Sequence, residues 1–203
     1  NPLWNASQNS RDKGSNLLLS NYFMAEYFPT TEWRVRARLG LTYGNDDTEK
    51  FYSRNDTRYE NVETTKKGEF YSNNVRTNQV EAEVSVTYAK MLGKHRINLV
   101  AGGNISSNES LSQGYSAVGF PDGDFSYPSF SNGYPEYGTP AYYESVSRSV
   151  NGYFNAGYAF DDRYLMDFSL RTSGSSVFGT SRKYNTTWSV GVGWNLHKEK
   201  FIM

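Results

Sequence analysis

The chain has 203 residues with 21 basic and 21 acidic side chains, so its formal net charge is zero, and it contains no cysteine. This balance argues against a nucleic-acid partner held by bulk charge, and the lack of cysteine excludes disulfides and thiolate metal ligands. Mean hydropathy is −0.71 while aromatic residues make up 16%. Low hydropathy is compatible with membrane-spanning strands, because such a strand offers lipid only every second residue.

Alternation of apolar and polar residues with a period of two predicts about seven long strands. Residues 1–15 are polar and are expected to form a loop. From 148 to 196, bulky apolar side chains alternate with small or charged ones, which is typical of a strand between lipid and water. The predicted strands cover, in chain order, about residues 17–28, 33–43, 79–88, 96–101, 148–160, 164–171 and 187–195.

The lengths of the links between these strands alternate along the chain, a pattern here called the parity of the links. Those after the first, third and fifth strands are short, those after the second and fourth are long, and the one after the sixth is intermediate. All six prolines fall in predicted loops or turns. This predicts an all-β fold, an antiparallel up-and-down meander with its short turns at one end. Outer-membrane barrels have this arrangement, with short periplasmic and long extracellular links. We expect the longest link, residues 106–147, to be an extracellular loop.

A soluble antiparallel sandwich or open sheet would also alternate apolar and polar residues. However, strands of about ten residues are longer than the roughly 5–6 usual in soluble sheets. A sandwich also gives no reason for the parity of the links. The barrel interpretation is therefore favoured.

One segment resembles a known family. The run from Arg171 through Ser173, Gly174, Ser175, Ser176, Val177 and Phe178 to Gly179 resembles the strand-end motif of SusC/RagA-type TonB-dependent outer-membrane transporters. It is followed, as in that family, by a Trp-Ser-x-Gly-x-Gly-Trp strand from Trp188 to Trp194. Ser173 stands where the family usually has Asp, and Val177 where a basic residue is more usual.

The resemblance implies a barrel of about 22 strands with a plugged lumen. Its implied partners are a SusD-like surface lipoprotein, outer-membrane lipid, an oligosaccharide or peptide ligand, and TonB, reached through a missing N-terminal part. Residues 1–203 would then be a segment of that barrel, with no plug and no signal peptide, in the outer membrane. The competing hypothesis is a soluble or surface β-sheet binding or adhesion module that recognises glycan or protein through its aromatic loop.

Charged residues on two sequential strands predict a ladder facing the lumen. Opposite charges across paired strands contribute roughly 0.2–1 kcal/mol each, whereas an arginine facing lipid at mid-depth would cost about 2–4 kcal/mol. We hypothesise that the ladder also seats the plug; a merely solvated wall is the open alternative. The residues are Arg34, Arg36 and Arg38 opposite Glu81 and Glu83.

The predicted loop is rich in aromatic side chains, whose faces suit sugar rings or apolar peptide side chains. Packing within the loop or against a lid protein is the alternative. The candidate ligand contacts are Tyr115, Phe120, Asp122, Asp124, Phe125, Tyr127, Phe130, Tyr134 and Tyr137, with Tyr142 and Tyr143 completing the aromatic set.

No motif points to catalysis or to a bound cofactor. The two histidines, His95 and His197, lie in or near predicted turns far apart in the sequence, and surface turn histidines are expected. Asp122 and Asp124 lack the further acids that a calcium loop needs. We therefore expect no enzyme, no cofactor and no metal site.

Overall fold

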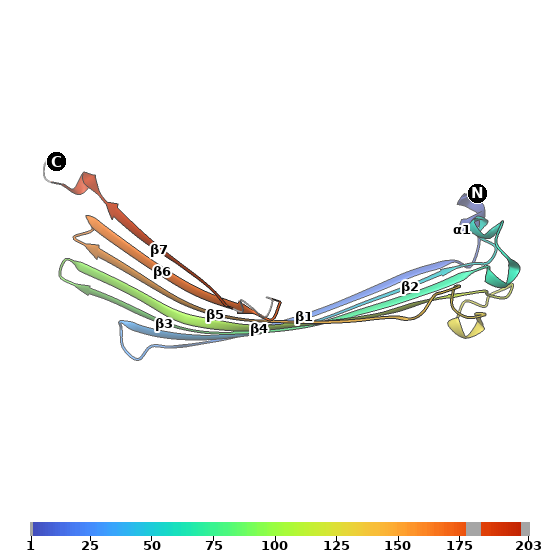
Figure 1. The fold of residues 1–203 in the computed structure, drawn as a ribbon, viewed down its shortest axis with the longest axis horizontal. Coiled ribbons are helices and arrows are strands. Elements are labelled where there is room, and N and C mark those ends of the chain that lie inside the picture. The colour runs from blue at the N-terminus through green and yellow to red at the C-terminus, as the bar shows by residue number, and fades with distance from the viewer. Residues whose placement is uncertain (1, 178–183, 200–203) are drawn as a thin grey trace. The chain divides into compact units, whose positions relative to one another are not determined.

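The computed structural model describes residues 2–177 and 184–199 and contains a single sheet there. Its strands are hydrogen-bonded in chain order, β1 to β7, as an antiparallel meander, and are drawn in this order in Figure 1. The predicted fold class, an all-β antiparallel meander of about seven long strands, is confirmed. The strands are β1 (Arg11–Tyr27), β2 (Trp33–Tyr52), β3 (Glu69–Leu92), β4 (His95–Val118), β5 (Ala141–Phe160), β6 (Tyr164–Ser175) and β7 (Tyr184–Trp194).

Short helical segments accompany the strands. They are α1 (Pro2–Ala6), η1 (Thr57–Tyr59), η2 (Thr64–Lys66), η3 (Pro128–Phe130) and η4 (Leu196–Lys198). No helix in the described part of the chain has the length and apolar character needed to cross a membrane.

The chain divides into two compact units. Unit 1 comprises Asn1–Leu19, Tyr43–Asn78 and Glu109–Ser145, and unit 2 comprises Ser20–Thr42, Gln79–Asn108 and Val146–Met203. The short links 28–32, 93–94 and 161–163 all belong to unit 2, whereas the long links 53–68 and 119–140 belong to unit 1. The predicted parity of the links is therefore confirmed for these five; the link from β6 to β7 lies partly outside the described residues.

Unit 1 holds the best-buried core of the described residues. Phe51 of β2, Phe70 of β3, Ala117 of β4 and Phe120 pack together, with Tyr115 partly buried against them. The rings of Phe51 and Phe120 meet edge to face at 5.0 Å, a favourable arrangement. This core fixes the beginning of the long link 119–140 on the sheet.

A second set of contacts fixes α1 to the link that joins β2 to β3, and Figure 1 shows the two side by side. The indole Nε1 of Trp4 donates to the carbonyl of Asn55 at 2.8 Å. The amide of Asn5 donates to Thr57 Oγ1 at 2.9 Å and accepts from the Thr57 backbone at 3.1 Å. Residues 1–15 were predicted to be loop, but they hold this helix and the start of β1.

The strands run further than the sequence predicted, and the largest extensions are in β2 to β5. β2 continues to Tyr52, β3 already begins at Glu69, β4 extends to Val118 and β5 begins at Ala141. The loop predicted for residues 106–147 is therefore the shorter link 119–140. In these extensions polar residues occupy both faces, so the backbone ladder continues without the apolar alternation that marks a strand in the sequence.

Candidate functional site

The strand register of unit 2 separates an apolar face from a polar one. Across β5, β6 and β7, Tyr153 pairs with Arg171, and Arg171 pairs with Thr187. At the next position of β5, Phe154 pairs with Leu170, and Leu170 pairs with Trp188. On the apolar face Trp188 is 71% and Val192 80% exposed. A contiguous exposed apolar face of this kind marks a surface that contacts an apolar partner. Its exposed members in β3 and β5 to β7 include Val80, Val84, Val150, Met166, Phe168, Trp188, Val190 and Val192.

The polar face carries a three-residue network over three strands. The guanidinium of Arg38 in β2 forms an ion pair with the carboxylate of Glu83 in β3. The hydroxyl of Tyr153 in β5 donates to the other oxygen of that carboxylate at 2.8 Å. Glu83 is thus held from both sides, and hydrogen bonds to a charged group contribute more than neutral ones.

The remaining charges of the predicted ladder are arranged differently. Arg36 forms its ion pair with Glu26 of β1 at 2.6 Å rather than with an acid of β3. Arg34 and Glu81 make no ion pair within the described residues. Arg34 lines a hollow of about 290 Å³ together with Arg36, Glu83 and Tyr153. Glu26 was missed because the first predicted strand showed the weakest alternation.

Two glycines make room for tyrosines on this face. A Cβ placed on Gly102 of β4 would lie 2.6 Å from Cζ and Oη of Tyr153, and one on Gly40 of β2 would lie 3.0 Å from Cε1 of Tyr22. Real Cβ contacts do not come as close as 2.6 Å. Tyr153 therefore crosses β4 above Gly102 to reach Glu83.

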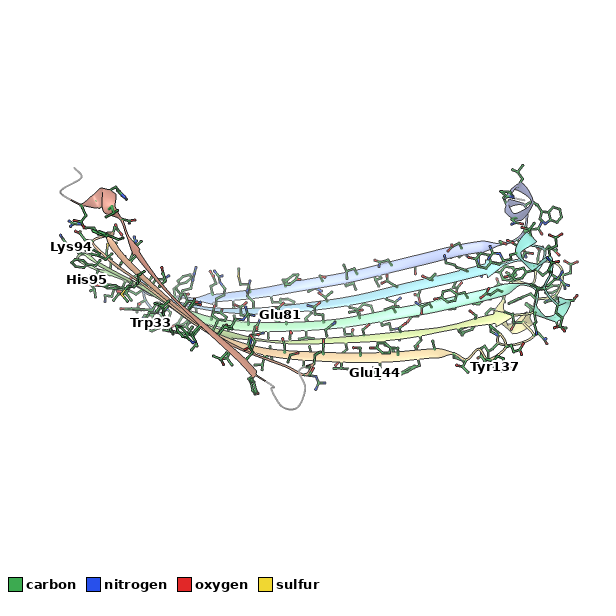
Figure 2. The ribbon with its side chains drawn as sticks, turned by 45° about the horizontal axis from the view of Figure 1, so that its top comes forward. Trp33, Glu81, Lys94, His95, Tyr137 and Glu144 are labelled. Atoms are coloured by element: carbon green, nitrogen blue, oxygen red, sulfur yellow. The ribbon has the colours of Figure 1, made fainter. Side chains whose placement is uncertain are left out.

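The aromatic candidates of the predicted loop divide into buried and exposed residues. Phe120 is only 2% exposed and packs in the core of unit 1. Tyr115 is partly buried beside the same core. Tyr137 is 97% exposed, and Figure 2 shows it on the link before β5. Phe125, Tyr127, Phe130 and Tyr134 are also exposed. So are Tyr142 and Tyr143, which lie in β5 rather than in a loop.

Some exposed aromatics have local partners. Phe125 and Phe130 meet edge to face at 5.0 Å, and the guanidinium of Arg11 lies 5.9 Å from the ring centre of Tyr127. Tyr137 adopts a φ of 62°, which is uncommon for a residue with a side chain. The long link therefore presents aromatic faces from a partly fixed backbone.

Of the other acidic and histidine residues singled out in the sequence, Asp122 and His95 have hydrogen-bond partners. Asp122 accepts from the amide of Asn55 at 3.0 Å and from the Gly123 backbone at 3.1 Å, whereas Asp124 is exposed. Within the described residues no group of three potential metal ligands converges. The ring Nδ1 of His95 lies 2.7 Å from the hydroxyl of Tyr158, while His197 is in η4.

The family motif forms the end of β6. Arg171 donates from Nε to Ser173 Oγ at 3.2 Å, and Gly174 is buried. Ser175 Oγ accepts from the Val177 backbone at 3.2 Å. Ser176 exchanges two hydrogen bonds with the Arg148 backbone, at 2.8 and 2.9 Å. Phe178 and Gly179 lie outside the described residues.

Comparison with known proteins gives two relatives of one kind. The chain is 24% identical over 206 residues to TonB-dependent receptor P26 of Formosa agariphila, covering all of this chain and 20% of that protein. TonB-dependent receptor P3 of the same organism is 26% identical over 126 residues, covering 62% of this chain and 12% of that protein. The chain thus spans a fifth or less of the curated relatives it matches. No family model matches it.

A solved structure shares the fold. The RagAB peptide transporter superposes with a TM-score of 0.83 at 20% identity, covering 95% of this chain and 21% of that chain. The fold of this segment is therefore that of a piece of the larger chain. Together with the relatives, it confirms the resemblance to SusC/RagA-type TonB-dependent transporters inferred from the motif.

Proposed function

We propose that this chain forms part of the wall of a TonB-dependent outer-membrane importer. The exposed apolar face of unit 2 would lie against lipid, and the polar face with Arg38, Glu83 and Tyr153 would face the lumen. The observation that supports this most strongly is the similarity of the entire chain to a TonB-dependent receptor, on a sheet whose faces differ in this way. An exposed apolar band and a polar interior are what a transmembrane barrel requires. The role is transport and not catalysis.

Cysteine labelling tests this placement, because residues 1–203 contain no cysteine and the unsubstituted full-length protein shows any labelling elsewhere. Val190→Cys and Ser189→Cys would place a thiol on the apolar and the polar face of β7, respectively. In outer membranes that contain the full-length protein, we expect a lipid-soluble maleimide to label the Val190→Cys variant and a water-soluble one to label the Ser189→Cys variant. Water-soluble labelling at both positions would refute the membrane placement. An antibody to this segment should also detect a band several times larger than 23.1 kDa in the outer membrane.

We further propose that the ladder on the polar face seats the plug. Arg36 is a poor test residue because its charge reversal would repel Glu26 whether or not a plug is present. Arg34 is better suited, since it has no ion pair among the described residues and lines an open hollow. We expect Arg34→Glu in the full-length protein to reduce uptake without reducing its amount in the membrane. Arg36→Glu combined with Glu26→Arg preserves the pair and serves as control; normal uptake by Arg34→Glu would refute plug seating.

The ligand proposal concerns the exposed aromatics of the link 119–140. We propose that they contact an oligosaccharide, or alternatively an oligopeptide, held beneath a SusD-like lipoprotein. The high exposure of Tyr137 and the tyrosine-rich composition support this, since aromatic faces stack on sugar rings and apolar side chains. Movement of the plug, driven through TonB by a part of the protein outside this chain, would then release the ligand inward.

Substitution of these aromatics tests ligand contact. Tyr134→Ala and Tyr137→Ala should weaken ligand binding to the full-length transporter with its lipoprotein. Tyr142→Ala, which removes an exposed ring from β5, is the control. Competition of uptake by glycan fragments or by peptides distinguishes the two ligand classes. Unchanged affinity for both classes in the Tyr134 and Tyr137 variants would refute the contact.

A further inference from the structure

A cluster of charged side chains surrounds the hairpin turn between β5 and β6 in unit 2. Asp161 and Asp162 are the central residues of the turn closed by the Arg163 N–H to Phe160 carbonyl hydrogen bond, and both have a φ of 52°, as in the tight turns that match the twist of a hairpin. Each carboxylate pairs with one arginine at 2.9 Å and with one lysine, at 3.3 Å for Asp161 and 3.5 Å for Asp162. The set, here called the turn cluster, is Lys94, Arg96, Asp161, Asp162, Arg163, Lys198 and Glu199.

The turn cluster has more cations than carboxylates. Four basic side chains face three acidic ones, and the imidazoles of His95 and His197 line the same hollow of about 550 Å³. Figure 2 shows Lys94 and His95 at the turn that joins β3 to β4. The two arginines hold the aspartates at the shorter distance, so the lysines are the cations that can turn toward an external anion without leaving an aspartate unpaired.

A row of aromatic rings lies directly beside the turn cluster on the apolar face. Phe160, Tyr164 and Trp194 are opposite one another in the register of β5, β6 and β7. Their rings are stacked, with centres 6.4 Å and then 6.3 Å apart. The hydroxyl of Tyr164 and the indole N–H of Trp194 both donate to one oxygen of Glu199, at 3.1 and 3.2 Å.

Glu199 therefore joins the aromatic row to the turn cluster. It also lies 3.5 Å from Arg163. The polar tips of the rings point to the charged end, and their apolar bodies continue the exposed apolar face of Met166 and Val192. Aromatic side chains that are apolar at one end and polar at the other occupy the boundary between hydrocarbon and headgroups.

We propose that the turn cluster and the aromatic row bind the headgroup of an anionic phospholipid. The phosphodiester would lie against Lys94 and Lys198, with the acyl chains along the apolar face beyond the aromatic row. The positive excess supports an anionic lipid, because a zwitterionic headgroup would bring its own ammonium toward the lysines. This inference rests on the proposed membrane placement of unit 2. It specifies the class of lipid that binds at the turn between β5 and β6.

Native mass spectrometry of the full-length transporter in detergent tests the proposal, with phosphatidylglycerol and phosphatidylcholine as probes. We expect phosphatidylglycerol to be retained preferentially and Lys94→Gln with Lys198→Gln to abolish the preference. A basic residue near an anionic lipid surface corresponds to about a fivefold change in affinity. Lys50→Gln with Lys66→Gln removes two ion-paired lysines from unit 1 and should leave the preference intact.

Two results would overturn the proposal. One is equal retention of phosphatidylglycerol by both double variants. The other is displacement of the lipid by millimolar inorganic phosphate, which would indicate a site for a free anion. The same preparations are assayed for recovery from the outer membrane and for uptake. A protein that is recovered there and imports its ligand without lipid preference refutes this inference alone; absence from the membrane refutes it together with the proposed function.

Discussion

The contact between Tyr153 and Gly102 leads to a sharp prediction for the polar face of unit 2. A methyl group at Gly102 would lie 2.6 Å from the ring carbon and hydroxyl of Tyr153 and 2.9 Å from the carbonyl oxygen of Val84. Either the backbone of β4 must shift, or the tyrosine must leave and give up its 2.8 Å hydrogen bond to Glu83. We therefore expect Gly102→Ala to destabilise the protein.

The expected size of the destabilisation follows from the free-energy cost of each of these two changes, the shift of β4 or the loss of the hydrogen bond. Overpacking of a well-packed site costs about 1–3 kcal/mol, and a lost hydrogen bond to a charged group costs about 1.5–3 kcal/mol. The protein follows the less costly route, so the free energy of unfolding should fall by about 1–3 kcal/mol. Urea unfolding of the full-length protein in detergent, followed by tryptophan fluorescence, measures this change.

A nearby glycine provides the control. A Cβ at Gly152, next to Tyr153 in β5, meets no atom within 4 Å, so Gly152→Ala should change the free energy of unfolding by less than about 0.5 kcal/mol. Adding Tyr153→Leu to Gly102→Ala should recover part of the loss, because the shorter side chain no longer reaches β4. If Gly102→Ala costs no more than Gly152→Ala, or if the two substitutions at 102 and 153 are additive, the proposed contact is wrong.

Two further predictions concern unit 1. Phe51→Ala removes a fully buried ring that packs on Phe120; it should cost about 3–5 kcal/mol and speed hydrogen exchange in the link 119–140, whereas Tyr137→Ala should not. Burial raises the pKa of the Tyr59 phenol to about 12. Its neutral form favours the folded state below pH 10, and that stability, up to about 3 kcal/mol, is lost as pH rises toward 12. Alkaline titration should therefore show the link 53–68 opening in this range, and Tyr59→Phe should reduce that sensitivity; an identical profile would contradict it.

The sequence predicted the meander because two independent signals agreed. Alternation marked each strand where one face is apolar, and the parity of the links placed the short turns at one end. The signal failed where both faces are polar. In the continuation of β2 through Asp46 and Glu49 to Tyr52, alternate side chains no longer differ, although the backbone ladder continues. Periodicity therefore located the two-faced part of each strand and missed its polar extension.

The sequence predicted only those contacts of the charged site that join strands consecutive in the chain. The sequence brought Arg38 and Glu83 together because β2 and β3 are consecutive. It did not predict Tyr153, which belongs to β5. Nor did it predict the partner of Arg36, since Glu26 lies in a strand with little alternation. Hydrogen bonding between next-nearest strands has no counterpart in a pattern read along one strand.

A physical rule accounts for the contacts that were missed. Neighbouring strands are about 4.8 Å apart, so a side chain reaches the next strand but one only by lying flat across the strand between them. That requires the intervening residue to lack a side chain. Gly102 meets this condition for Tyr153 on its way to Glu83. Gly40 meets it for Tyr22, since a Cβ built on Gly40 would lie 3.0 Å from Cε1 of Tyr22 and 3.9 Å from the Cβ of Glu81. A glycine on the polar face, flanked by a tyrosine on one neighbouring strand and an acid on the other, is therefore a signal for such a bridge. Recognising this signal requires the strand register as well as the sequence, because a shift of one residue in the register moves the glycine to the opposite face of the sheet.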